Sequence, residues 1–255
     1  MADDRTPPKV LVHGNPEVAA IWGGLIAALH DRGVDEIVTL SPPGFGAPVG
    51  PTWRATRAEY VGWLRSEIQA IGRPVDIVGH DWGAGHVYGL LDVEPGLVHS
   101  YATDIAGVLH PSYVWHDMAR AWQTPDVGEQ VVEAMLAGDS AGRATAYVDL
   151  GIPHDVAQAM AEAANEQMGR CILGLYRDAA QPAVAELGGR LFAASLPPGL
   201  VLGPTEDAYV PHDQSVDVAA RLGARVAELA GQGHWWMLED PAPAADVLVG
   251  FWRSL

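Results

Sequence analysis

The chain has 255 residues, of which 49% are hydrophobic, and its formal net charge is −17. A chain of this length can bury the core of one domain together with a modest insertion. The acidic balance excludes a nucleic-acid-binding protein, which needs a basic face, and it argues against binding to an anionic membrane surface.

Three sequence features indicate the compartment. The N-terminal segment Met1–Pro8 is polar and contains no apolar stretch that would act as a secretion signal. No apolar run is long enough to cross a bilayer. The single cysteine, Cys171, cannot form an intrachain disulfide. We therefore expect a cytoplasmic protein.

Short apolar runs typical of strands alternate along the chain with segments of helical periodicity, a pattern that predicts a parallel sheet with crossover helices. The strands are expected at residues 9–13, 36–40, 75–78, 99–105, 199–202 and 225–229. The helices that flank the sheet are expected at residues 21–29, 56–71, 82–91, 216–222 and 242–252.

Between residues 107 and 197 this alternation stops. The segment is rich in alanine and methionine, helical in period and poor in strand signals. We interpret it as a helical cap inserted between two strands of the sheet. The predicted division is a core domain of residues 1–106 and 198–255 and a cap of residues 107–197.

The strongest functional motif is Gly79-His80-Asp81-Trp82-Gly83, which lies between an expected strand and an expected helix. The flanking glycines allow a sharp turn that holds the central residue in a strained conformation at the edge of the sheet. An aspartate after a strand also serves as a helix N-cap, but the two glycines favour the other interpretation. We therefore predict that Asp81 is a nucleophile.

A second segment, Gly138-Asp139-Ser140-Ala141-Gly142, matches the Gly-x-Ser-x-Gly pattern literally. It follows a helical segment inside the expected cap, and no buried strand precedes it. Without such a strand the turn has no reason to present its serine, so we interpret this segment as a turn between helices.

Two further motifs supply partners for Asp81. His13-Gly14-Asn15-Pro16 follows the first strand, and there the backbone N–H of Asn15 would form an oxyanion hole with that of Trp82. His234 lies on a glycine-rich loop after the last strand, where a general base can reach the turn at Asp81.

The acid that orients His234 has two candidates. Asp207 lies just beyond the fifth expected strand, and Asp104 lies near the end of the fourth. Either carboxylate would hold the imidazole in the required tautomer and stabilise its cation. We favour Asp207, because nothing else explains an acid at that place.

These motifs, at residues 13–16, 80–83 and 233–235, resemble those of the α/β-hydrolase superfamily, and within it the branch with an aspartate nucleophile. That branch contains epoxide hydrolases and haloalkane dehalogenases. The resemblance covers essentially the whole chain and implies a mostly parallel sheet with flanking helices and a helical cap. Members usually carry two more strands before the first motif, and here fewer than ten residues precede the first strand. The N-terminal strands are therefore expected to be shortened, which leaves an edge that would suit a homodimer.

The resemblance also implies how the leaving group is held. Epoxide opening produces an alkoxide and needs an acidic donor opposite the nucleophile. Leu173-Gly174-Leu175-Tyr176-Arg177 and Tyr113-Val114-Trp115-His116 resemble the cap segments that supply it, so Tyr176 and His116 are the expected pair. A halide needs only hydrogen-bond donors, and Asn15 and Trp82 match the donor pair of many dehalogenases.

We therefore expect an epoxide hydrolase that converts a small apolar epoxide to a vicinal diol through an alkyl ester on Asp81, without cofactor or metal. Water activated by His234 would hydrolyse that ester. The alternative is a haloalkane dehalogenase that uses the same Asp81 and His234. A further alternative is a binding protein that has kept the fold and lost the activity.

Overall fold

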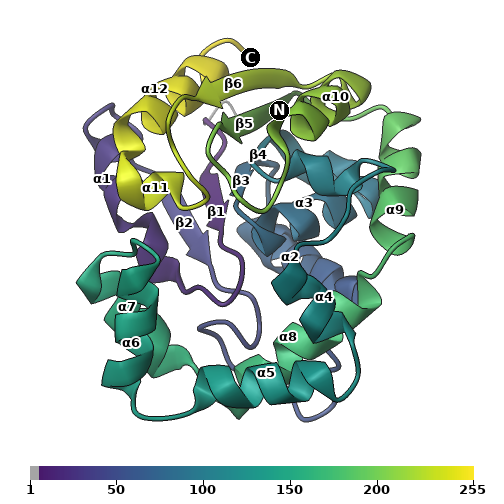
Figure 1. Cartoon of the computed structure of the whole chain (residues 1–255). Helices are drawn as coiled ribbons and strands as arrows, with labels where there is room; N and C mark the ends of the chain where they lie inside the picture. The colour runs from purple at the N-terminus through teal and green to yellow at the C-terminus, as the bar shows by residue number, and fades with distance from the viewer. Residues whose placement is uncertain (1–5) are drawn as a thin grey trace.

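The computed structural model describes residues 6–255; residues 1–5, which form most of the polar N-terminal segment, lie outside the described residues. Six strands form one sheet in the order β2-β1-β3-β4-β5-β6, and every neighbouring pair is parallel. The strands are β1 (Lys9–Val12), β2 (Ile37–Leu40), β3 (Val75–Gly79), β4 (Val98–Thr103), β5 (Gly199–Pro204) and β6 (Arg225–Leu229). The predicted parallel sheet is therefore confirmed, and β2 and β6 are its edges (Figure 1).

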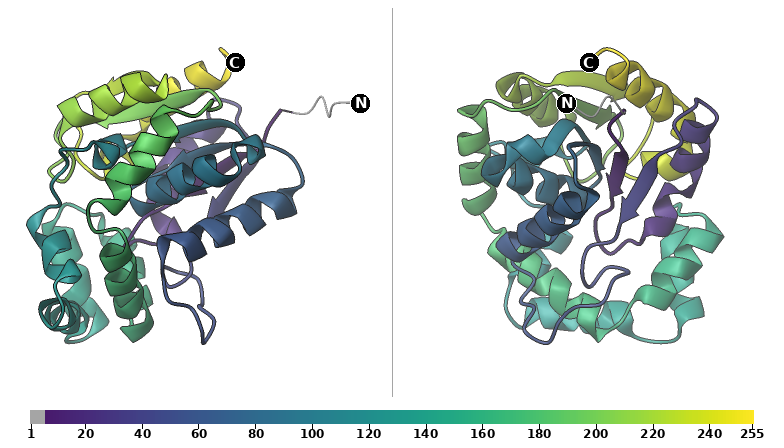
Figure 2. Two further views of the ribbon diagram at one scale, coloured as in Figure 1. Left: turned by 90° about the vertical axis from the view of Figure 1, so that its right-hand side faces the viewer. Right: turned by 180° about the vertical axis from the view of Figure 1, so that it is seen from behind.

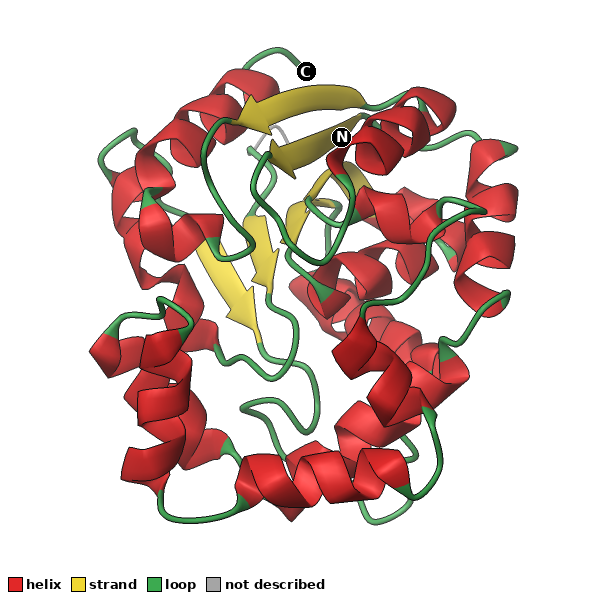
Figure 3. Cartoon of the chain, viewed as in Figure 1, coloured by secondary structure: helices red, strands yellow, loops and turns green. Residues whose placement is uncertain are grey.

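Helices surround the sheet (Figure 3). Those of the first half of the chain are η1 (Ala19–Trp22), α1 (Gly23–His30), α2 (Arg57–Ile71), α3 (Trp82–Val93), η2 (Pro95–Leu97) and η3 (Ala106–Leu109). They are followed by α4 (Asp117–Gln123), α5 (Val127–Leu136), α6 (Ser140–Asp149), α7 (His154–Ala163), α8 (Glu166–Asp178) and α9 (Ala183–Phe192). The last are α10 (His212–Leu222), α11 (Trp236–Glu239) and α12 (Pro241–Trp252). None of the helices in residues 6–255 has the length and hydrophobicity that a membrane-spanning helix requires.

Side chains of successive strand residues enter two separate cores, because they point to opposite faces of the sheet. In β1, Val10 and Val12 join the core beneath α2, α3 and α10, whereas Leu11 joins the core beneath α1 and α12. All three are fully buried. A strand that is covered on both faces reads as a continuous apolar run, which is why β1 was recognisable from its sequence.

Between β4 and β5 the chain is helical, from η3 through α9. Figure 2 shows that α4 to α8 gather beyond the carboxyl ends of the strands, while α9 lies beside α3. Two groups form this layer: α4, α5 and α8 pack together, and α6 packs on α7. The division into a core and a cap of residues 107–197 stays a prediction. The layer of α4 to α8 covers most of that segment, whereas α9 belongs to it in sequence and packs beside α3.

Several expected boundaries shift. The fourth strand ends at Thr103, so Asp104 lies in the turn before η3 and not inside the strand. The helix expected from residue 216 begins at His212, directly after Pro211. The short helix α11 was not predicted, because its four residues are too few for a periodic pattern.

The junction of β3 and α3 depends on a close approach between two backbones. A Cβ atom added to Gly83 would lie 2.1 Å from the carbonyl oxygen of Val12 in β1. Neither backbone can give way without moving a central strand. Asp81 has φ +48° and ψ −126°, a strained conformation for a residue with a side chain.

Replacing Gly83 by alanine is therefore expected to lower the free energy of unfolding by about 2–4 kcal/mol. The measurement is chemical denaturation of the purified variant. Gly62→Ala is the matched control, because Gly62 lies inside α2 and an added Cβ meets no atom within 4 Å. That variant is expected to gain up to about 1 kcal/mol from helix propensity. Equal effects of the two substitutions would contradict the argument.

Candidate active site

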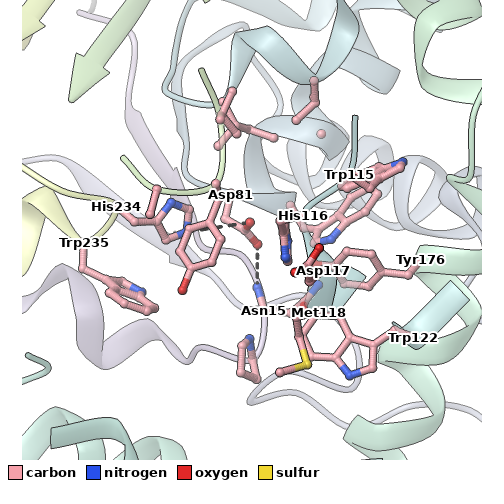
Figure 4. A pocket seen from close by; sticks show the side chains of 18 of the residues that line it. Asn15, Asp81, Trp115, His116, Asp117, Met118, Trp122, Tyr176, His234 and Trp235 are labelled. Carbon is pink, nitrogen blue, oxygen red and sulfur yellow. Dashed lines mark hydrogen bonds and ion pairs between the residues drawn. The ribbon is translucent and has the colours of Figure 1, made fainter. Parts of the chain in front are cut away.

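Four of the predicted site residues lie on loops that follow parallel strands. Asn15 follows β1, Asp81 follows β3, Asp207 follows β5 and His234 follows β6. The carboxyl ends of parallel strands meet at one edge of a sheet, and there Asn15, Asp81 and His234 line one cavity (Figure 4). Asp207 joins them through its hydrogen bond to His234.

His234 lies between two carboxylates. Its Nδ1 is hydrogen-bonded to Oδ2 of Asp207 at 2.9 Å, and its Nε2 lies 3.9 Å from Oδ2 of Asp81. The backbone N–H groups of Tyr209 and Val210 donate to Oδ1 of Asp207 and hold that carboxylate still. The imidazole is therefore oriented by Asp207 and faces Asp81.

Burial and charge act in opposite directions on these groups. Burial opposes the cation of His234, but the hydrogen bond and the charge of Asp207 outweigh burial and raise the pKa of His234 above its usual value. Burial raises the pKa of Asp81 to about 6, although the nearby His234 opposes this shift. The Asp81 carboxylate is consequently less stabilised by solvent than an exposed one.

The loop after β1 contacts the Asp81 carboxylate directly. The backbone N–H of Asn15 donates to Oδ1 of Asp81 at 3.0 Å. The chain approaches so closely that a Cβ atom on Gly14 would lie 2.1 Å from the same oxygen. Trp82, whose backbone N–H is the second expected donor of the oxyanion hole, is the first residue of α3.

Asp104, the other candidate for orienting His234, is bound elsewhere. Its Oδ2 accepts hydrogen bonds from Nδ1 of His80 and from Nε1 of Trp236, and its Oδ1 accepts the N–H of Asp81. Both carboxylate oxygens of Asp104 are therefore bound by groups other than His234. Of the two candidates, the structure brings only Asp207 to His234. The prediction for Asp104 is therefore corrected: its side chain holds the turn at Asp81 by accepting the N–H of that residue.

His80 is the centre of a buried ionic network that the sequence analysis missed. It has no exposed surface, and it lies between Asp104 and Glu17, whose Oε1 is 2.9 Å from Nε2 of His80. Burial opposes a cation there, but the two carboxylates outweigh burial and raise the pKa of His80 well above its usual value. We define Glu17, His80 and Asp104 as the ionic triad.

The ionic triad joins three loops of the site. Glu17 also accepts the N–H of Gly14 and the indole N–H of Trp235, and Asp104 accepts the indole N–H of Trp236. Both residues lie in or beside motifs that the sequence analysis singled out, because His80 is part of the Asp81 motif and Glu17 lies two residues after Asn15. Nothing in the sequence indicated that the two side chains meet.

One group of potential metal ligands occurs in the described residues: Glu17, His80 and His234 offer atoms within 4.8 Å of one another. Both ring nitrogens of His80, however, face carboxylates and carry protons in its cationic form. A protonated imidazole has no lone pair for a metal, so the chemistry of these groups is that of an ion network.

The cap residues Tyr176 and His116 line the same cavity of about 920 Å³ as Asp81, His234, Asn15 and Trp82 (Figure 4). The ring of Tyr176 packs edge-on against Trp82 with centroids 5.3 Å apart. Nδ1 of His116 accepts the backbone N–H of Ala119 at 3.3 Å, so in the neutral ring the proton is on Nε2.

Ser140, from the rejected serine motif, is the first residue of α6. The side chain of Asp139 caps this helix by accepting the N–H of Gly142 at 2.9 Å. The segment thus has the structure of a helix start, and no strand precedes it.

The comparisons with known proteins agree with this fold. The model of the α/β-hydrolase family matches residues 10–247. No curated protein sequence gives a significant match. Among solved structures, an ancestral haloalkane dehalogenase is similar with 22% identity and a TM-score of 0.76, over 98% of this chain and 92% of that one. A loop variant of a haloalkane dehalogenase from Bradyrhizobium elkanii has 20% identity and a TM-score of 0.75 over the same shares.

A bromoperoxidase from Bacillus anthracis is also similar, with 16% identity and a TM-score of 0.75, over 98% of this chain and 92% of that one. At such identities the solved structures establish the fold, and their different activities are not transferred to this chain. The family model matches nearly the whole chain, including every loop of the site. The chain therefore belongs to the α/β-hydrolase family and is classed as a hydrolase.

Proposed function

We propose that the protein is an epoxide hydrolase that forms a covalent alkyl ester on Asp81. The observation that carries this proposal is the composition of one cavity. It is lined by the Asp81 carboxylate, by His234 with its partner Asp207, and by two cap side chains with donor groups, Tyr176 and His116. Most of the other lining residues are apolar, which suits an apolar substrate.

In the first step an oxygen of Asp81 attacks a ring carbon of the epoxide, and the carbon–oxygen bond of the ring breaks. The leaving oxygen receives a proton from Tyr176 while Nε2–H of His116 donates a hydrogen bond. Burial and the charge of Asp81 raise the pKa of Tyr176 well above its usual value. Ester formation removes that charge, so Tyr176 becomes a better acid as the ring opens.

In the second step Nε2 of His234 takes a proton from water, and the resulting hydroxide attacks Cγ of the Asp81 ester. The backbone N–H of Asn15, which donates to Asp81 in the free protein, stabilises the oxyanion together with that of Trp82. The carbon–oxygen bond between Cγ and the diol then breaks, and the departing oxygen takes the proton from His234. The remaining hydroxyl proton of the intermediate leaves Asp81 as a carboxylate and returns Tyr176 to its phenol form. Asp207 stabilises the imidazolium between these transfers.

A haloalkane dehalogenase is the second candidate, and one observation favours it. Nδ2 and Oδ1 of Asn15 are both buried without a hydrogen-bond partner, and Asn15 lines the cavity. A free amide N–H in the cavity that Trp82 also lines would suit a halide ion. Attack by Asp81 would then break a carbon–halogen bond, and no proton donor would be needed.

The covalent scheme predicts that His234→Gln accumulates the ester, because attack by Asp81 remains possible and hydrolysis does not. Mass spectrometry of this variant after incubation with a reactive epoxide is expected to show a mass increase equal to the whole substrate. Asp81→Asn is the matched control and should show neither adduct nor turnover. If His234→Gln carries no adduct with any epoxide or bromoalkane, the scheme is wrong.

Two assays with the same protein identify which leaving group it accepts: diol release from epoxides and halide release from bromoalkanes. Tyr176→Phe is expected to lower kcat for epoxides about 100-fold or more, since it removes an acid catalyst. The same substitution should change kcat for bromoalkanes less than about fivefold, because halide requires no proton. Halide release without any diol would overturn the first choice and favour the second.

The raised pKa of Asp81 sets the acid limit of kcat/KM, which reports ester formation by the free enzyme. Hydrolysis of the ester needs neutral His234, whose raised pKa limits kcat instead. Only the carboxylate attacks, so kcat/KM is expected to fall about tenfold for each pH unit below a pKa of about 6. The measurement is kcat/KM against pH for an epoxide that is stable in mild acid. A profile that stays flat down to about pH 4.5, near the ordinary carboxyl range, would contradict the assignment.

A further inference from the structure

Helix α6 presents one face to the cavity, and that face carries a charged side chain. Arg143, Ala146, Tyr147 and Leu150 all line it, and their spacing of three, one and three residues places them along one face of α6. The cavity that contains Asp81 therefore extends along this face and is bordered there by Arg143.

The Arg143 guanidinium is held by backbone carbonyls. Its Nε and Nη2 donate to the oxygen of Ala161 at 3.4 and 3.1 Å. Its Nη1 donates to the oxygens of Leu136 and Gly138 at 3.2 and 2.9 Å. A guanidinium has five N–H groups, so these four contacts leave one N–H, on Nη2, without a partner.

No carboxylate of residues 6–255 lies within ion-pair distance of Arg143. The other arginine that lines the cavity differs in this respect, because Arg57 is paired with Asp178 at 3.0 Å. The positive charge of Arg143 is thus fixed in position but not neutralised. In a cavity that is otherwise mostly apolar, such a charge attracts an anion more strongly than it would in water.

A second part of the cavity is apolar. Its lining residues come from η3 and the residue before it, from α9, and from the loop before α10: Ile105, Val108, Leu109, Val184, Leu187 and Val210. These side chains offer neither hydrogen-bond donors nor acceptors. An elongated substrate with one apolar end and one anionic end would match both parts.

We propose that Arg143 is a specificity-determining residue that binds the carboxylate of an acidic, amphiphilic substrate. The apolar part of that substrate lies between η3 and α9, and its reacting carbon lies at Asp81. The inference deepens the proposed function, on which it rests for the identity of the reacting group. Binding of the anion itself does not depend on that reaction.

The hydrogen bonds of Arg143 also hold the turn between α5 and α6 against α7. The test must therefore distinguish the effect of losing the charge from the effect of losing these hydrogen bonds. Lysine keeps the charge and cannot reproduce the forked set of four contacts, whereas methionine removes both. Arg225→Met is the matched control, because Arg225 lies on the edge strand β6, is hydrogen-bonded to Ser254 and does not line the cavity.

The test measures binding of octanoate and 1-octanol at about pH 8, where octanoate is ionised, through the fluorescence of the tryptophans that line the cavity. Arg143→Met is expected to raise the Kd of octanoate about tenfold. Arg143→Lys is expected to raise it less than about threefold, and 1-octanol should bind all variants equally well. Unchanged octanoate binding in Arg143→Met, or equal losses in the lysine and methionine variants, would overturn the proposal.

A kinetic arm separates this proposal from the proposed function. With an epoxyoctanoate and its methyl ester, Arg143→Met should lower kcat/KM about tenfold for the acid and leave the ester unchanged. If both epoxides are hydrolysed and the ratio does not change, the anion site is wrong and the hydrolase assignment stands. If neither is hydrolysed while octanoate binds as expected, the hydrolase assignment fails and the anion site stands.

Discussion

The ionic triad is the constraint on which the geometry of the site depends. His80 has carboxylates on both of its ring nitrogens and no exposed surface, so its charge has no solvent to stabilise it. Through Glu17 the triad holds the loop after β1, and through Asp104 it holds the N–H of Asp81. The indoles of Trp235 and Trp236 attach the loop that carries His234. Removing one member of such a network leaves an uncompensated buried charge, which costs about 3–5 kcal/mol.

The same burial also acts on Asp81. Asp81 accepts the N–H of Asn15 and faces His234, yet burial still raises its pKa to about 6. The aromatic residues of the cap layer contribute to that burial, because Trp115 and Tyr176 pack around Trp82, next to Asp81 in the chain. A carboxylate in such surroundings has lost most of the hydration that would otherwise slow its attack on carbon. The residues that shape the cavity thus also set the properties of the carboxylate that we propose as the nucleophile.

Local sequence patterns were informative where local physics decides the structure. The parallel sheet followed from apolar runs separated by helical periodicity, and all six strands were expected within a few residues of their observed bounds. The turn at Asp81 followed from its glycines, of which Gly83 is required by the carbonyl of Val12. The serine motif at Ser140 was correctly set aside, because it starts a helix. The short helix α11 could not be found, since four residues carry no period.

The sequence by itself determined which side chains end the strands, and therefore that Asp81, His234, Asn15 and an acid would meet at one edge of the sheet. It did not decide whether Asp104 or Asp207 orients His234, because both follow strands at that edge. Only the tertiary structure distinguished them, by bringing Asp207 to Nδ1 of His234 and Asp104 to His80. It alone revealed Glu17 beneath the site and Arg143 in the cavity wall. The physical reason is that periodicity encodes which face of an element is buried, whereas a hydrogen bond between distant residues depends on how whole elements pack.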